Sequence, residues 1–177
     1  MADVLVRMAA TGDAPAIAWL RARFLDAPAT GEAFTREVAE WLEDEGERRT
    51  TWLAERDGAV LGMASLFEYR RMPKPGLPGS RWGYVSNMFV REEARDAGVG
   101  AALLDAVIAA ADERGYARLV LSPAERAIPF YERAGFVVPT QAAGSDRLLV
   151  RRGFRPLGEH PQGNPAPWAG VPPRPRG

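Results

Sequence analysis

A strand, a turn with two glycines and a helix follow one another between Tyr84 and Gly115, and this stretch constrains the fold more than any other. Residues 85–90 are short and largely apolar, with β-branched and aromatic members, which is typical of a buried strand. Gly115 provides a C-terminal stop for the helix. Beyond the turn, apolar residues recur at helical spacing at Val99, Leu103, Ala106, Val107 and Ala110.

The turn reads Arg95-Asp96-Ala97-Gly98-Val99-Gly100. Two glycines at the mouth of a helix let a ligand approach the backbone, and the unpaired N–H groups of the first helical turn point toward that ligand. These donors and the positive end of the helix dipole favour an anion such as a phosphate. The alternative is that Gly98 and Gly100 only permit a tight turn and close helix packing.

Two familiar phosphate-binding motifs do not fit this turn. A P-loop needs Lys-Ser or Lys-Thr after its second glycine, but Ala101 and Ala102 follow Gly100. A dinucleotide fingerprint needs a third glycine, where this chain has Leu103, and an acidic residue ending a second strand about 20 residues later, which is also missing. A nucleotide hydrolase is therefore weakly supported, because the loop lysine and the metal-binding hydroxyl are absent.

The turn resembles the acyl-CoA loop of the GNAT (GCN5-related N-acetyltransferase) superfamily. That loop has Arg or Gln, two variable residues, Gly, one variable residue, then Gly or Ala, and Arg95, Gly98 and Gly100 match it. Residues 117–121 resemble the strand that follows, and Pro-Phe-Tyr-Glu-Arg-Ala-Gly-Phe at 129–136 resembles the next helix with its Gly-Phe turn. The resemblance covers roughly residues 4–152.

The resemblance implies an α/β (α+β) fold, in which helices flank a mixed, mostly antiparallel central sheet and a splayed central strand pair binds acyl-CoA. It implies an N-acetyltransferase that moves an acetyl group from acetyl-CoA to a primary amine by direct attack in a ternary complex. The acceptor is then a small-molecule or peptide amine. A non-catalytic acyl-CoA sensor or assembly module of the same fold is the alternative.

The same resemblance implies site residues. Tyr131 is placed as the general acid, and the base is either Glu68, near the end of a strand, or a water chain. Ser122 either bonds the cofactor or begins a turn. Asp96 should point to solvent, because an acidic side chain beside a pyrophosphate is unfavourable. The remaining predicted cofactor-binding residues are Met88, Phe89 and Val90 for the pantetheine arm, Arg95, Asp96, Ala97, Gly98, Val99, Gly100 and Ala101 for the pyrophosphate, and Phe130.

Composition narrows the chemistry. The chain has no cysteine and a single histidine, His160, which excludes disulfides, thiolate metal sites, a cysteine nucleophile and a His-based zinc cluster, so no metal is expected. Its 23 Lys plus Arg balance 23 Asp plus Glu, so nucleic-acid and membrane partners are not implied. No stretch approaches the ~18 apolar residues that span a bilayer, and a cytoplasmic location is expected by default.

The N-terminal half predicts two helices and a hairpin. Residues 4–8 read as an edge strand, and Asp13 is placed to cap a helix whose apolar face includes Ile17, Leu20 and Phe24. A second helix is expected to end at Gly46. Asp-Gly at 57–58 should join strands 51–55 and 59–69. Core or groove packing is favoured over a specific ligand role for Trp19, Phe34 and Trp41.

The remaining segments are connections and strands around the central stretch. Prolines and glycines predict a loop at residues 70–80. After Phe136, residues 137–139 read as a short strand, 141–145 as a turn and 146–151 as a final strand. Residues 155–177 are proline-rich and are predicted to lack a fold of their own, so the domain is expected to span residues 1–154. A monomer or a homodimer is expected.

Overall fold

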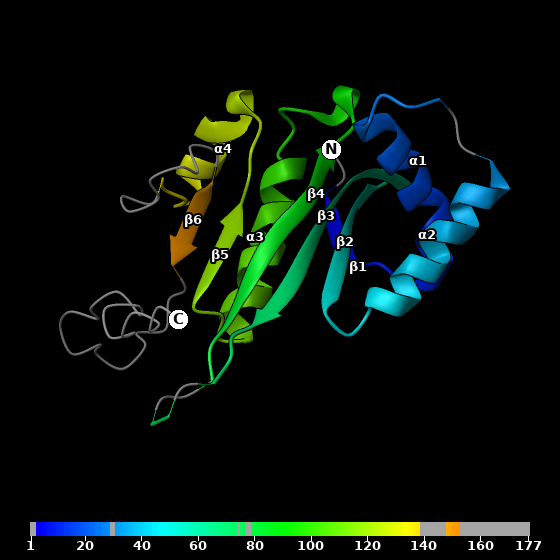
Figure 1. The fold of residues 1–177 in the computed structure, drawn as a ribbon. Helices are drawn as coiled ribbons and strands as arrows, with labels where there is room; N and C mark the ends of the chain where they lie inside the picture. Colours follow the sequence, from blue (N-terminus) through cyan, green and yellow to red (C-terminus); the bar gives the residue numbers. More distant parts are fainter. Residues whose placement is uncertain (1–2, 29–30, 74, 77–78, 139–147, 153–177) are drawn as a thin grey trace, which may run out of the picture.

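The computed structural model describes residues 3–28, 31–73, 75–76, 79–138 and 148–152. Within them, six strands form one sheet in the order β1-β2-β3-β4-β5-β6 (Figure 1). Every neighbouring pair is antiparallel except β4 and β5, which run parallel. The strands are β1 (Leu5–Met8), β2 (Arg49–Arg56), β3 (Ala59–Arg70), β4 (Arg81–Val90), β5 (Arg118–Leu121) and β6 (Leu149–Arg152). The predicted mixed, mostly antiparallel sheet is confirmed.

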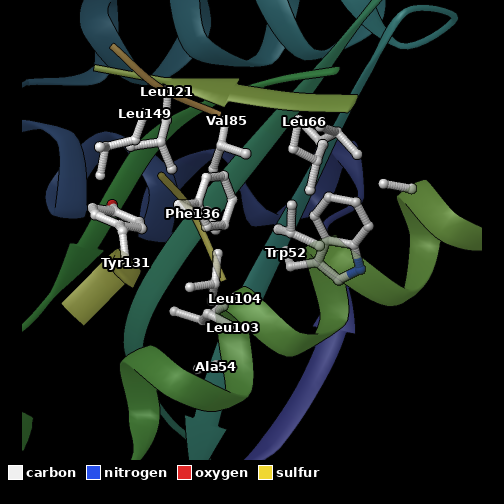
Figure 2. Packing of buried hydrophobic residues seen from close by; sticks show 14 of the residues in the cluster. Trp52, Ala54, Leu66, Val85, Leu103, Leu104, Leu121, Tyr131, Phe136 and Leu149 are labelled. Atoms are coloured by element: carbon white, nitrogen blue, oxygen red, sulfur yellow. The ribbon is translucent and has the colours of Figure 1, made fainter. Parts of the chain in front are cut away.

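Helices cover both faces of this sheet. The helices are α1 (Ala14–Phe24), α2 (Glu32–Glu45), α3 (Val99–Glu113) and α4 (Ile128–Arg133). Alternate residues of β2 separate the two faces, because Trp52 and Ala54 pack in one apolar cluster while Leu53 packs in the other. The first cluster joins the sheet to α3 and α4 through residues such as Leu104 and Tyr131 (Figure 2). The second cluster joins the sheet to α1 and α2.

The hairpin between β2 and β3 forms where Asp-Gly predicts it. Asp57 and Gly58 both have positive φ, 52° and 76°, which a two-residue turn of this hand requires. The next connection is shorter than expected. β3 continues through Arg70, and the Arg71 N–H donates to the Ser80 carbonyl at 2.9 Å to close the β3–β4 pair. The predicted loop therefore begins one residue later, at residue 71.

Two local predictions are corrected. Asp13 occupies the N-cap position of α1 but makes no capping bond to that helix. Its carboxylate instead accepts from the Ala10 N–H at 2.8 Å, at the start of the 3₁₀ turn Thr11–Asp13, and forms a two-point ion pair with Arg7 at 2.8 Å. The strand expected at residues 137–139 is reduced to a single bridge between Val137 and Val150. Pro139, the expected turn at 141–145, the start of the last strand and the C-terminal segment 155–177 lie outside the described residues.

Candidate active site

The central strands separate at one end of the sheet. β4 pairs with β5 only at Gly83 with Leu119 and at Tyr84 with Val120, and then runs on to Val90 while still pairing with β3 (Figure 1). A bulge interrupts the β3–β4 register between Met63 and Ser65. Asn87, on the bulged side, has a left-handed φ of 51°. Bulges bend a strand and increase its twist, so this one directs β4 away from β5.

The residues predicted to hold a pyrophosphate form the entrance to α3. A 3₁₀ turn (Glu92–Ala94) leads into Asp96 and Gly98, both with positive φ, at 59° and 79°. The first bond of the helix runs from the Ala102 N–H to the Gly98 carbonyl at 3.0 Å. The amides of residues 99–101 precede that bond and have no acceptor within the helix. Asp96 is exposed, as an anion site here requires.

Three predicted residues meet at this entrance. A Cβ added to Gly100 would lie 3.6 Å from the Phe130 ring and 3.6 Å from Val90 Cγ2. Gly100 of α3, Phe130 of α4 and Val90 of β4 are thus neighbours, although they come from separate parts of the chain. A backbone without side chains at Gly98 and Gly100, with free amides, suits the close approach of a phosphate. The arrangement fits the phosphates and pantetheine of an acyl-CoA.

Other predicted cofactor residues lie around this point. Arg95 is exposed, and its Nε donates to the Val90 carbonyl at 3.3 Å. Met88 packs against the α3 side of the sheet, whereas the Phe89 ring lies 5.7 Å from Phe24 of α1 on the other side. Ser122 follows the last residue of β5 and is exposed. Ala97 and Ala101 are exposed as well.

Tyr131 lies on α4 with only 7% of its surface exposed. Its ring makes edge-to-face contacts with Phe130 and Phe136, at centroid distances of 5.0 and 5.8 Å, and lies close to Leu149 in Figure 2. Burial raises the pKa of the Tyr131 phenol to about 12. The hydroxyl therefore stays protonated at neutral pH.

Glu68 is not brought together with these residues. Its carboxylate accepts hydrogen bonds from the Tyr116 hydroxyl at 2.7 Å and Arg70 Nε at 2.8 Å, and lies 3.6 Å from Arg81. Burial alone would raise the pKa of Glu68, but the bonds from Arg70 and Tyr116 and the charge of Arg81 outweigh it and hold that pKa below its usual range. Along β3, Glu68 shares the face of Leu66, which packs toward α3.

A cavity of about 560 Å³ lies on the opposite face, between α1, α2 and strands β2 to β4. Asn87 of the bulge lines it, so the cavity reaches the point where β4 and β5 part. The other lining residues are Ile17, Arg21, Phe34, Glu37, Val38, Trp41, Arg49, Met63, Ser65, Phe67, Tyr69, Tyr84 and Ser86. Phe34 and Trp41 are therefore groove residues, as predicted, whereas Trp19 lies outside the lining and is 43% exposed.

Polar side chains cross the cavity floor in one row. Ser65 pairs with Thr51 on β2 and with Ser86 on β4, and the Thr51 and Ser65 hydroxyls are 2.9 Å apart. Asn87 Nδ2 donates to Ser65 Oγ at 3.4 Å, and Arg21 Nη1 donates to Asn87 Oδ1 at 3.0 Å. The row links α1 to the bulge. The sequence analysis missed these residues, although one serine stands two residues from an aromatic residue on each strand, Ser65 from Phe67 and Ser86 from Tyr84, which is the spacing of one strand face.

The described part of the chain holds no group of three or more His, Cys, Asp or Glu side chains that could bind a metal ion. Within the same ranges, no helix has both the length and the apolar character needed to cross a membrane.

Solved structures share this architecture. A predicted acetyltransferase from Clostridium acetobutylicum, crystallised with acetyl-CoA, superposes with a TM-score of 0.64 at 20% identity, over 78% of this chain and 93% of that one. A GCN5-related N-acetyltransferase from Ralstonia eutropha gives a TM-score of 0.62 at 26% identity, over 78% and 95%. These superpositions place the molecule among proteins with the acetyltransferase fold.

The sequence comparison gives the family. The chain belongs to the acetyltransferase (GNAT) family, whose model matches residues 15–136. A curated relative, the glucosamine 6-phosphate N-acetyltransferase of Trypanosoma brucei brucei, is 32% identical over 79 residues, which is 45% of this chain. The match spans about half of that relative, 52% of its length.

Proposed function

We propose that this protein is an N-acetyltransferase that transfers the acetyl group of acetyl-CoA directly to a primary amine within a ternary complex. One observation carries the proposal. The bulge at Asn87 borders the cavity on one face of the sheet, while the strand beyond it, free of β5, runs to Val90 beside the entrance of α3. A donor along β4 and an acceptor in the cavity would therefore meet at the bulge.

In this proposal the chain binds the donor through its backbone. The amides of residues 99–101 and the positive end of α3 hold the pyrophosphate, while β4 backbone groups of Met88 to Val90 hold the pantetheine arm. Acetyl-CoA supplies a thioester, whose C–S bond breaks as the amine forms a C–N bond. The chain's task is to align the two molecules, and such alignment can supply about 7–11 kcal/mol of the barrier.

In this proposal the Tyr131 hydroxyl interacts with the sulfur atom of the departing CoA. A phenol with a pKa of about 12 is a weaker acid than a thiol, whose ordinary pKa is about 8.5. Complete proton transfer from Tyr131 would therefore be uphill. We infer that the hydroxyl donates a hydrogen bond, which stabilises negative charge on sulfur as it develops, while water completes protonation.

The amine must lose a proton before or during attack, and Glu68 faces away from the cavity. Of the described residues that line the cavity, Glu37 is the only one with a carboxylate, and it is exposed on α2. We propose that the proton leaves through water in the cavity toward the side on which Glu37 lies. The base is then solvent, which was one of the two alternatives that the sequence left open.

The donor site is tested by stability. Acetyl-CoA should raise the free energy of unfolding by about 2.7 kcal/mol at a hundredfold excess over its dissociation constant. Gly100→Asp should abolish this gain, because it puts a negative side chain between Phe130, Val90 and the free amides. Gly12→Asp is the control, because a Cβ at Gly12 meets nothing within 4 Å. Calorimetry that detects no acetyl-CoA binding to the wild type would refute the proposal.

Turnover is tested by CoA release with a panel of amines. The relative from Trypanosoma is named for glucosamine 6-phosphate, so that amine belongs first in the panel. Release that depends on both acetyl-CoA and one amine supports the enzyme. Binding of acetyl-CoA without release by any amine would favour the sensor or assembly module instead.

A further inference from the structure

A cation is set into the wall of the acceptor cavity. Arg49 is the first residue of β2, and its side chain is only 20% exposed. The guanidinium carbon lies 4.9 Å from the centre of the Trp41 ring and 4.7 Å from that of Phe67. Two aromatic faces thus hold the planar group in one orientation, while its removal from water costs free energy that a paired anion would offset.

The protein itself compensates this charge only in part. Nη1 donates to Ser86 Oγ at 3.4 Å, a long bond to a neutral group. Nε is buried and has no hydrogen-bond partner among the described residues. Glu45 Oε2 forms an ion pair with Arg49 Nε at 3.7 Å, a separation too long for a hydrogen bond, and this oxygen is likewise buried without a hydrogen bond. Burial, the largest effect on this group, lowers the pKa of Arg49, though Glu45 opposes it.

A second cation lines the same cavity. Arg21 of α1 donates to the side-chain carbonyl of Asn87 at 3.0 Å, which is a neutral partner at the bulge. The lining thus carries two guanidinium groups against the single carboxylate of Glu37. Glu37 forms no ion pair with either of them among the described residues, and it is exposed. The described lining residues therefore carry more positive than negative charge, and Glu45 offsets part of it from outside the lining.

We propose that the acceptor is a primary amine that also carries an anionic group, a carboxylate or a phosphate, and that Arg49 binds this group. The inference rests on the function proposed above, and it narrows the substrate class. A guanidinium fork presents paired N–H donors that match the oxygens of either anion, and the rings of Trp41 and Phe67 keep that fork oriented.

The strand register limits the length of such a molecule. Arg49 pairs with Phe67, and Phe67 pairs with Tyr84, which lies three residues before Asn87 on β4. At about 3.4 Å per residue, this row is roughly 10 Å from the bulge. The Arg49 side chain reaches forward to Ser86 and shortens that distance. The amine and the anion therefore belong to one small molecule rather than to distant parts of a polymer.

Matched acceptors test the charge requirement on the wild-type protein. Glucosamine 6-phosphate is compared with glucosamine, and phenylalanine with phenylalaninamide, by calorimetric titration of the protein alone and with CoA present. The charged member of at least one pair should bind roughly 10- to 100-fold more tightly, because its neutral counterpart leaves the part-buried Arg49 guanidinium without a hydrogen-bonded anion. The pair that shows the difference distinguishes a phosphate from a carboxylate. Equal affinities within both pairs would overturn the inference.

Variants then test the residue. Arg49→Gln should erase the preference within the pair, Arg49→Lys should keep part of it, and acetyl-CoA affinity should not change in either. Arg36→Gln is the matched control, because Arg36 is exposed on α2 and does not line the cavity. A preference that persists in a folded Arg49→Gln protein would refute the role of Arg49. Acetylation of neutral and anionic amines with equal kcat/KM would refute the substrate class while the proposed function stands.

Discussion

Two buried tyrosines on the α3 side of the sheet differ in what their hydroxyls do. Tyr116, 2% exposed, donates its hydroxyl to Glu68 at 2.7 Å. Tyr131, 7% exposed, has no side-chain hydrogen bond among the described residues. The Tyr116 hydroxyl is engaged by Glu68, whereas the Tyr131 hydroxyl is the one available to a ligand. The pair also provides its own control.

Tyr131→Phe removes the hydroxyl and keeps the ring. If the hydroxyl stabilises charge on the departing sulfur, kcat should fall by roughly 10²–10³ while acetyl-CoA affinity changes little. Tyr116→Phe, measured in parallel by CoA release, should keep kcat within a few fold, because that hydroxyl bonds Glu68 away from the cavity. Wild-type turnover in the Tyr131 variant, with chemistry shown to limit the rate, would remove Tyr131 from the mechanism.

The variant Glu68→Gln distinguishes a structural role of the Glu68 carboxylate from a role as the catalytic base. The folded-state pKa of Glu68 lies below its ordinary value of 4.5. The ionised carboxylate therefore stabilises the folded protein above that value, and this contribution is lost as pH falls through the folded pKa. At pH 7 the free energy of unfolding of Glu68→Gln should be about 1 kcal/mol lower than that of the wild type, a modest difference because Arg70 is exposed. In acid this difference should vanish. Denaturant titrations at pH 7 and pH 3 measure this, and a large loss of kcat at unchanged stability would restore Glu68 as the base.

Among the helices, strands and turns, those that depend on residues adjacent in sequence were predicted correctly. The Asp57-Gly58 turn and the span of α3 follow from residues adjacent in sequence, and both are confirmed. The bulge at Asn87 and the face on which Glu68 lies depend on how β3 pairs with β4 and on which helices cover each face. A shift of one residue exchanges the two faces of a strand, so proximity to a strand end did not reveal where Glu68 points.

Gly62 tests how far the bulge depends on close packing. A Cβ at this position would lie 2.6 Å from the Phe89 carbonyl oxygen, a backbone atom that can move only with β4. Gly62→Ala should therefore lower the free energy of unfolding by about 1–3 kcal/mol and weaken acetyl-CoA binding. Gly12→Ala has open space and should do neither. Melting and calorimetry report the two effects, and an unchanged wild-type profile in Gly62→Ala would show that β4 adjusts freely.

In the whole molecule, strand β4 contributes to both faces of the sheet. On one face it packs toward α3, on the other it lines the cavity beneath α1 and α2, and along its edge it pairs with β5. Motifs on α3 and α4 could be predicted from sequence, because the proposed donor site uses backbone groups beside glycines that the sequence shows directly. The cavity proposed for the acceptor could not be predicted, because its lining comes from α1, α2, β2, β3 and β4 and exists only once these elements pack.

Acetyl-CoA and the amine acceptor should therefore protect different backbone segments from amide hydrogen exchange. Acetyl-CoA should slow amide hydrogen exchange at residues 86–90 and 96–102, where β4 runs free of β5 and α3 begins, and leave α2 unchanged. Glucosamine 6-phosphate should slow exchange in α1 and α2, which cover the cavity, and at the bulge. Only residues 86–90 should respond to both ligands. Exchange measured by mass spectrometry on each binary complex tests this, and protection of α2 by acetyl-CoA alone would show that the donor occupies the cavity and that the two sites are not separate.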